Sequence, residues 1–457
     1  MKKLPLVAAL FAAATSALAD LYATLTVNGT PYDQGGAGWA YAGATVSLTN
    51  AGPFVLSTGG ENFTSNVAVV AQADCAVTFT NLEVFAGNHA GLSPFTVAPG
   101  VSVALTLEGN TVLKAGSGAA AITVVSNATG VASLTIDADA SDTFHTLGAT
   151  GGNQGAGIGG GDGEACGSVT INGGLLTVEG GANAAGIGGG RNGAGGAVTI
   201  SGGLLTVRSA GSYAFVGGRL KTTNGGAAIG GGYQGAGGMT AISGGTMSLT
   251  GVGDGAAIGP GKDGAGGTTA ITGGSILARV GAVEPPPSNG VAQVWPVSVT
   301  GLADSAAPSL PWLPATYGTN DLVAVGGEIC VWLPTGDYAY GEAESDGAGG
   351  MRRHAVLVDV EGNVTLDGWT TVSPLSSLTI TGFTLDTDGT ATIAFEGDGD
   401  LASVANSLSV EVSATPDFTT LLVPASTNLT TSGATGSFTV GKPEGDHSAL
   451  FYRVQER

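Results

Sequence analysis

Carboxylate side chains could provide acid–base or metal chemistry, so their distribution is a first test for a catalytic site. Polysaccharide-cleaving enzymes need acids, a base and often calcium converging on one groove. Between residues 150 and 281 the only carboxylates are Asp162, Glu164, Glu179, Asp254 and Asp263. Asp162 and Asp263 fall in equivalent turns of a repeated sequence, three repeats apart, so they cannot converge. We therefore predict no catalytic residue and no enzyme activity, and keep a polysaccharide lyase or glycosidase only as an alternative.

The histidines, cysteines and glycine motifs indicate no cofactor site. The histidines are scattered singly, without HExxH spacing, at His89, His145, His354 and His447. The cysteines lie far apart and lack metal-ligand spacing, at Cys75, Cys166 and Cys330; the sequence leaves open whether two of them pair. Gly155, Gly157 and Gly160 match G-x-G-x-x-G, but the match follows from glycine richness and no helix is expected after it.

One acidic loop has the composition of a weak calcium site. Glu396, Asp398 and Asp400 stand in the sequence EGDGD, and carboxylate oxygens are the ligands that calcium prefers. The alternative is an ordinary solvated loop. Calcium is the one cofactor that the sequence leaves open.

Aromatic side chains are the other candidates for binding chemistry, because their rings stack on the faces of sugars. One group lies between residues 290 and 340 and contains Trp295, Trp312, Trp332 and Tyr338. A second group, Tyr213 and Phe215, stands in an insertion that also carries Arg219 and Lys221. The alternative for the first group is that Trp332 and its neighbours form a hydrophobic core.

These candidates are set in a chain dominated by an internal repeat. Four similar segments are marked by Ile158, Ile187, Ile229 and Ile258; the marker stands in GIGGG in the first two, AIGGG in the third and AIGPG in the fourth, and each segment continues into a strand that ends before a glycine pair. The steps between these markers are 29, 42 and 29 residues, so the middle step holds a 13-residue insertion, between about Arg208 and Asn224. A repeat of this length is typical of a solenoid, in which each unit buries its apolar face against the next. The insertion must project as a loop, because the repeats on both sides keep their register.

Each repeat carries two short strands with alternating apolar residues. In the first repeat Val169 and Ile171 precede a glycine pair, and Leu176 and Val178 follow it. Equivalent residues are expected to stack in columns, one being Ile171, Ile200, Ile242 and Ile271, and another Leu176, Leu205, Met247 and Ile276. The intervening positions vary freely in charge and size, as solvent-facing positions do. Asp162 is expected near Arg191, and Glu179 near Arg208.

The repeat pattern resembles the GIGGG-repeat segments of large secreted bacterial surface proteins, over residues 155–281. The looser repeats upstream are more distantly similar to extracellular polysaccharide-binding β-helix modules. The resemblance implies an all-β fold, a right-handed parallel β-helix (a solenoid) followed by one or two small β-sandwich-like modules. It is specific for the fold and says little about function.

The ends and the composition indicate where the chain works. Lys2 and Lys3, the apolar run to Ser16 and the A-x-A sequence ending at Ala19 predict a signal peptide, residues 1–19, and export from the cell. The chain has 82 glycines and a net charge of −21, which disfavours nucleic acid as a partner. No segment of the mature chain is long and apolar enough to span a membrane.

We divide the mature chain into three parts. Residues 20–283 are expected to form an N-terminal cap and the β-helix, 290–371 an aromatic-rich β module, and 373–457 a C-terminal β-sandwich with a hairpin from Phe383 to Phe395 turning at Asp388-Gly389. The predicted function is a non-enzymatic structural or adhesive protein, extracellular or at the cell surface, with the periplasm as an alternative location. The alternative function is recognition of extracellular glycans. The sequence leaves the ligand, the anchoring and the oligomeric state open.

Overall fold

The structure is a computed structural model that describes residues 24–64, 66–138, 145–216, 219–345, 351–372, 378–386, 390–397, 408–413, 421–422, 427–432, 435–443 and 451–456. These residues form strands and turns and contain no helix, so the all-β class is confirmed. The predicted signal peptide lies outside the described residues. The chain divides into two compact units, one of Met1–Ser309 with Pro314–Thr335 and one of Leu310–Leu313 with Gly336–Arg457.

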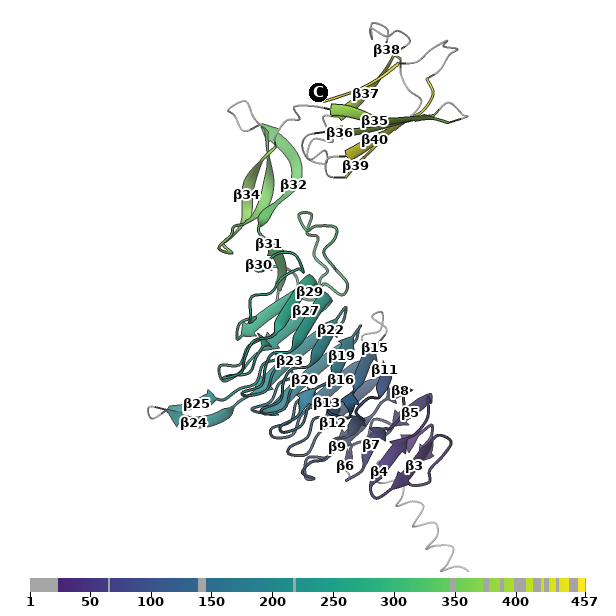
Figure 1. The fold of residues 1–457 in the computed structure, drawn as a ribbon, viewed down its shortest axis with the longest axis vertical. Coiled ribbons are helices and arrows are strands. Elements are labelled where there is room, and N and C mark those ends of the chain that lie inside the picture. Colours follow the sequence, from purple (N-terminus) through teal and green to yellow (C-terminus); the bar gives the residue numbers. More distant parts are fainter. Residues whose placement is uncertain are drawn as a thin grey trace, which may run out of the picture. The chain divides into compact units, whose positions relative to one another are not determined.

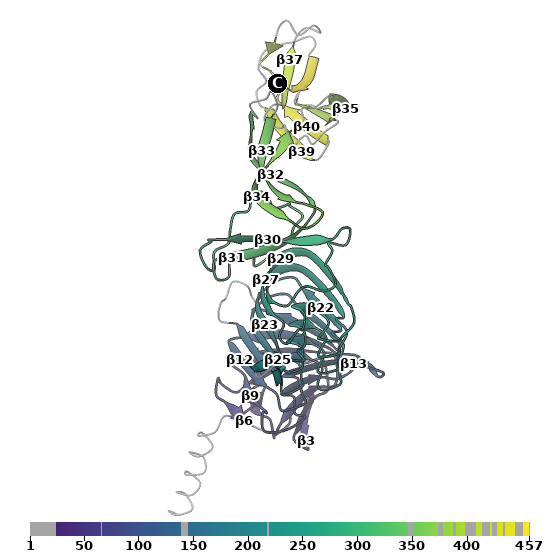
Figure 2. The same cartoon turned by 90° about the vertical axis from the view of Figure 1, so that its left-hand side faces the viewer.

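The first unit is built from three ladders of parallel strands, stacked as Figures 1 and 2 show. The first ladder contains β4 (Thr45–Leu48), β7 (Ala68–Ala71), β10 (Phe95–Val97), β13 (Ile122–Asn127), β17 (Ile158–Gly159), β21 (Ile187–Gly188), β26 (Ile229–Gly230) and β28 (Ile258–Gly259). Two short strands, β14 (Gly130–Val131) and β18 (Ala165–Cys166), pair antiparallel with β13.

The second and third ladders share their last two strands. The second contains β5 (Phe54–Ser57), β8 (Cys75–Thr80), β11 (Ser102–Glu108), β15 (Ser133–Asp137), β19 (Ser168–Ile171) and β22 (Ala197–Ile200). The third contains β6 (Phe63–Thr64), β9 (Glu83–Phe85), β12 (Asn110–Lys114), β16 (Thr146–Thr150), β20 (Leu175–Ala182) and β23 (Leu204–Ala210). β27 (Met239–Thr250) and β29 (Thr268–Val280) are long enough to continue both ladders.

Strand pairing confirms the columns predicted from the repeat. Ile171 pairs with Ile200, Ile200 with Ile242 and Ile242 with Ile271. The second column pairs in the same way, in the order Leu176, Leu205, Met247 and Ile276. These side chains are buried in one continuous hydrophobic core, whereas the residues that alternate with them in β19, β20, β22 and β23 are partly or fully exposed. Each repeat therefore gives one strand segment to each ladder and buries its apolar residues against the neighbouring repeats.

The glycine directly after each marker isoleucine is required by close backbone approach. Gly159, Gly188 and Gly230 all have φ between 133° and 138°. A Cβ atom added to any of them would stand 1.9–2.0 Å from the carbonyl oxygen of the equivalent glycine one repeat later. Only glycine fits such a position, which explains why a glycine follows the marker isoleucine in all four repeats.

Antiparallel strands cover the N-terminal end of the ladders. β1 (Thr26–Val27) pairs with β2 (Thr30–Pro31) and with β5, and β3 (Trp39–Ala42) pairs with β4. Trp39 is buried in the shared core. These strands occupy edges that would otherwise present unpaired backbone groups.

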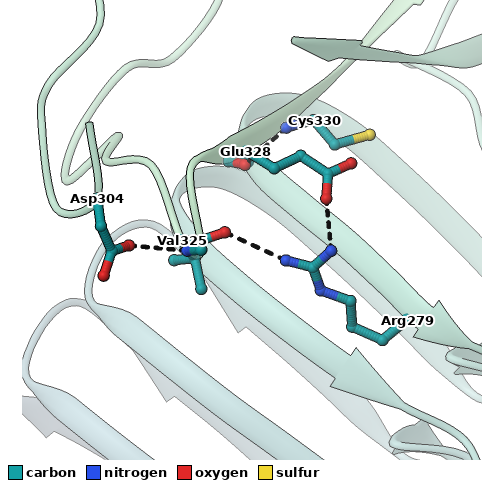
Figure 3. Close-up of polar contacts among 7 residues, drawn as sticks. Arg279, Asp304, Val325, Glu328 and Cys330 are labelled. Carbon is teal, nitrogen blue, oxygen red and sulfur yellow. Dashed lines mark hydrogen bonds and ion pairs between the residues drawn. The ribbon is translucent and has the colours of Figure 1, made fainter. Parts of the chain in front are cut away.

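A hairpin attaches beyond the last repeat, formed by β30 (Val294–Thr300) and β31 (Glu328–Pro334). Figure 3 shows how Arg279, in β29, fixes the start of β31: it forms an ion pair with Glu328 and donates to the carbonyl oxygen of Val325 at 3.2 Å. Asp304 accepts the N–H of Gly326 at 2.7 Å in the same loop.

Buried hydrogen bonds join this hairpin to the repeats. The Tyr317 hydroxyl donates to the carbonyl oxygen of Gly274 at 2.8 Å and accepts the Trp332 N–H at 3.0 Å. The Trp332 indole N–H donates to the carbonyl oxygen of Ile276 at 3.3 Å. Residues up to Thr335 therefore belong structurally to the repeats, apart from 310–313.

The second unit contains three antiparallel sheets. The first is β32 (Gly336–Ser345), β33 (Met351–Val358) and β34 (Val364–Val372). The second is β35 (Leu378–Leu385), β36 (Ala391–Gly397), β40 (Thr435–Val440) and β39 (Thr427–Ser432). The third is β38 (Leu421–Leu422), β37 (Leu408–Ser413) and β41 (Phe451–Glu456).

The last two of these sheets share a core. Ile393, Phe395 and Phe438 of one sheet pack in a cluster with Val412 of the other. Phe383 pairs with Ile393, so the predicted hairpin is confirmed. Its turn residues Asp388 and Gly389 lie outside the described residues.

Candidate functional site

The insertion between the second and third repeats forms a hairpin of two strands, β24 (Ser212–Val216) and β25 (Arg219–Thr223). Figure 1 shows it extending sideways from the stacked strands. Ser212 pairs with Thr223 at its base, and the flanking repeats keep their register across it. The prediction that the insertion projects is thus confirmed. We call Ser212–Thr223 the side hairpin.

The side hairpin exposes two aromatic rings on one face. Tyr213 is 71% exposed and Phe215 is 79% exposed, and both belong to β24 two residues apart. Alternation along a strand points them to the same side, about 7 Å apart. A two-stranded hairpin has no hydrophobic core of its own, so the exposed rings do not contribute to the stability of the fold. Tyr213 and Phe215 have the most exposed side chains among the candidate ligand residues.

The opposite face of the side hairpin is cationic. Arg219 pairs with Val216 and Lys221 with Ala214, and these positions alternate with those of the two rings. Both cationic residues are exposed. Neither forms an ion pair within the described part of the chain. The hairpin therefore combines an aromatic face with a positively charged one.

This charge belongs to a longer stretch without acids. Residues 180–253 contain no Asp or Glu, although the whole chain has 35 in 457 residues. The stretch carries four cationic residues, Arg191, Arg208, Arg219 and Lys221. Arg191 is neutralised by Asp162, whose carboxylate accepts two hydrogen bonds from its guanidinium at 2.8 and 2.9 Å. This ion pair was predicted and is confirmed. Arg208 is exposed and pairs in register with Glu179, as expected.

The other aromatic candidates are less exposed than the two rings of the side hairpin. Trp332 is only 7% exposed and packs in the hydrophobic core. This agrees with the alternative interpretation, that Trp332 belongs to a core and not to a binding surface. Trp295 and Trp312 are half-buried, in β30 and in a turn respectively. Tyr338 is half-buried in β32, and burial raises its pKa to about 12.

Sequence reasoning missed an aromatic stack on the sheet of β32, β33 and β34. Tyr340, His354 and Trp369 pair directly across the three strands. The centre of the His354 ring lies 4.0 Å from that of Trp369, and the Arg352 guanidinium carbon lies 3.8 Å from the same indole centre. The His354 ring and the Arg352 guanidinium therefore both lie against the indole of Trp369. The sequence signal for this stack was the alternation of aromatic and charged residues in YAY, RRH and DGW.

The same stack is fixed by a carboxylate. Asp367 accepts a hydrogen bond from the Tyr340 hydroxyl at 3.2 Å, and its Oδ1 lies 2.7 Å from His354 Nδ1. Trp369 is 38% exposed, and the His354 ring and the Arg352 guanidinium already contact its indole. A sugar ring needs a free aromatic face, so this stack is less suited to sugar binding than the side hairpin.

A groove on the repeats has a volume of 380 Å³ and contains two carboxylates, Asp162 and Glu164. Asp162 is held by Arg191, and Glu164 accepts the N–H of Gly161 at 2.9 Å.

Of the three calcium candidates, only Glu396 is among the described residues. Glu396 is exposed in β36, whereas Asp398 and Asp400 lie outside the described residues. Among the residues that the structure describes, no three acidic, histidine or cysteine side chains are grouped closely enough to hold a metal ion. Over the same residues, no helix has the length and apolar character needed to cross a membrane.

Comparison with known proteins finds no matching family model, no matching curated protein and no matching solved structure.

Proposed function

We propose that this protein is exported by a bacterium and acts without catalysis as a structural or adhesive protein, extracellular or at the cell surface. The parallel ladders are the observation that carries this proposal. They form a continuous core from repeat to repeat, which suits a stiff spacer that holds other elements away from the cell. The A-x-A sequence ending at Ala19 supports export.

In this proposal the ladders are the faces of a right-handed parallel β-helix. Successive strands visit the first, second and third ladder in turn and then return to the first, which is the path of a solenoid. Connections between parallel strands are almost always right-handed, which gives the hand. The antiparallel sheets after Thr335 would be β-sandwich-like modules that the spacer carries.

A second candidate function is carbohydrate binding, and the side hairpin favours it. Tyr213 and Phe215 offer free ring faces of the kind that stack on sugars. The hairpin projects from the repeats without contributing to their core. A glycan array probed with the mature protein tests this function, and binding to no glycan would contradict it.

Surface labelling tests the principal proposal. An antibody against residues 336–457 should label intact producing cells or the culture medium, and added protease should remove the label from intact cells. A cytoplasmic protein in the same cells serves as the control and should stay unlabelled. N-terminal sequencing of the exported chain should begin at Asp20. Label that emerges only after the cells are permeabilised, together with an intact Met1, would contradict export.

A further inference from the structure

We propose that the side hairpin is a binding site for an anionic polysaccharide. The inference rests on the second function above, carbohydrate binding, and adds the charge class of the ligand and the role of each face. The aromatic face makes the contact with sugar rings, and the cationic residues draw the polymer to it. The following observations carry the inference.

The two rings form a platform suited to a linear polymer. Tyr213 and Phe215 lie on one strand with about 7 Å between their positions, so they can contact successive parts of one chain. Both rings are more than two-thirds exposed in the free protein. Covering them with the apolar face of a sugar removes this area from water, which favours binding.

The positive charge of the surrounding sequence favours an anionic ligand. The 74 residues from 180 to 253 hold four cationic residues and no acid in a chain of net charge −21. Arg208, Arg219 and Lys221 are exposed and make no ion pair within the described residues. Of the nearest acids outside this stretch, Glu179 lies in register with Arg208, and Asp162 and Asp254 form ion pairs with Arg191 and Lys262. The side hairpin is therefore the part of the repeats where an anion meets attraction rather than repulsion.

The two faces act together although they point apart. Attraction between charges extends over about 8–10 Å at moderate salt, which is comparable to the thickness of a two-stranded ribbon. Arg219 and Lys221 can therefore stabilise a polymer that lies on the rings of Tyr213 and Phe215. The rings should provide the part of the affinity that does not depend on salt concentration. The cationic residues should provide the part that does.

A polysaccharide fits the size of the site better than a protein does. A stable protein–protein interface needs about 20–30 residues on each side. The side hairpin spans residues 212–223, and its aromatic face presents only two large rings. Pairing of two hairpins from two copies would also bring their cations together. A narrow polymer with many repeated units needs only such a strip, because many protein copies can bind along it.

The experiment measures binding of the mature protein to polygalacturonate and chondroitin sulfate, with methyl-esterified polygalacturonate as the neutral polymer of matched backbone. Biolayer interferometry at about 50 and 500 mM salt covers strong and weak screening. The variants are Tyr213→Ser with Phe215→Ser, and Arg219→Gln with Lys221→Gln. Lys442→Gln, an exposed cation of the second unit, is the matched control. All substituted side chains are exposed, so the variants should keep the thermal midpoint of the parent.

We expect binding to at least one of the two anionic polymers, weakened at high salt, and weaker binding to the neutral one. The Gln double variant should lose roughly tenfold in affinity at low salt and most of its salt dependence. The Ser double variant should lose affinity at both salt concentrations and keep its salt dependence. The control should bind like the parent.

Three outcomes would overturn the inference. Equal binding to polygalacturonate and its neutral ester would leave carbohydrate binding intact and remove the role of charge. Failure to bind all three polymers would overturn this site, while binding to other glycans on the array would still support the second proposed function. Light scattering that shows a dimer of the parent, lost in either double variant, would assign the hairpin to a second copy of the chain instead.

Discussion

The carbonyl oxygen of Gly230 lies 1.9 Å from the point where a Cβ atom on Gly188 would stand. The same approach recurs from Gly159 to Gly188 and from Gly230 to Gly259, with φ near 135° each time. Neighbouring repeats therefore meet backbone to backbone along this column, and the spacing between them leaves room for hydrogen atoms alone.

Substitution Gly188→Ala should lower the free energy of unfolding by about 2–4 kcal/mol, because the new methyl group meets backbone that cannot move away. Gly266→Ala is the matched control, since that glycine is exposed and a Cβ there meets nothing within 4 Å. For Gly266→Ala the free energy of unfolding should stay unchanged or rise by up to about 1 kcal/mol. Urea unfolding measures both. Equal losses in the two variants would contradict the glycine column.

The column of isoleucines predicts a contrast between adjacent residues. Ile200 is fully buried between Ile171 and Ile242, whereas Thr199 beside it is exposed. Ile200→Asp places an unpaired charge in the core and should cost at least about 3 kcal/mol, whereas Thr199→Asp should stay within about 0.5 kcal/mol. Thermal unfolding followed by circular dichroism compares them. Similar losses would show that the assignment of inward and outward faces is wrong.

The Tyr317 hydroxyl predicts how firmly the hairpin of β30 and β31 is attached. Tyr317→Phe leaves the carbonyl of Gly274 and the N–H of Trp332 without this partner, both in a buried setting. The loss should be about 2 kcal/mol or more. Tyr213→Phe removes the same atom at an exposed position and should change stability by less than about 0.5 kcal/mol. A loss no larger in Tyr317→Phe than in Tyr213→Phe would contradict the buried hydrogen bonds.

The buried thiol of Cys166 predicts a loss of stability in alkali. Burial raises its pKa from the ordinary 9.0 to about 12. The raised pKa means that the contribution is complete below pH 9 and is lost as the pH rises towards 12, because the unfolded chain releases the proton first. Between pH 9 and 10 the parent should lose about 1 kcal/mol that Cys166→Ala does not lose. Urea unfolding at both pH values measures this, and identical pH dependence of the two proteins would contradict it.

The repeat made much of the first unit predictable from sequence. Alternation around Ile171 and Leu176 indicates which side chains face inward, and the constant 29-residue step indicates which residues pair. The attachment of residues 317–334 was not predictable in this way. Tyr317 reaches Gly274 across 43 residues, and such a contact has no periodic signal.

The candidate site was predictable in part. The interrupted step located the side hairpin, and the constant register around it required that Tyr213 and Phe215 project. The stack at Trp369 needed the register of three antiparallel strands, which places Tyr340, His354 and Trp369 directly opposite one another. Alternation indicates which residues share a face of each strand, but it does not indicate which strands pair or in which register.

Removal of the side hairpin tests the central claim, that the repeats support themselves while the hairpin recognises a ligand. Deleting the 13 residues Gly211–Thr223 restores the 29-residue step between Ile187 and Ile229. The ends to be joined are already close, because Ser212 pairs with Thr223. Thermal unfolding and polysaccharide binding are then measured on the same protein. We predict a thermal midpoint within about 2 °C of the parent and loss of binding to anionic polysaccharide. Retained binding, or cooperative unfolding lost with the hairpin, would contradict the account.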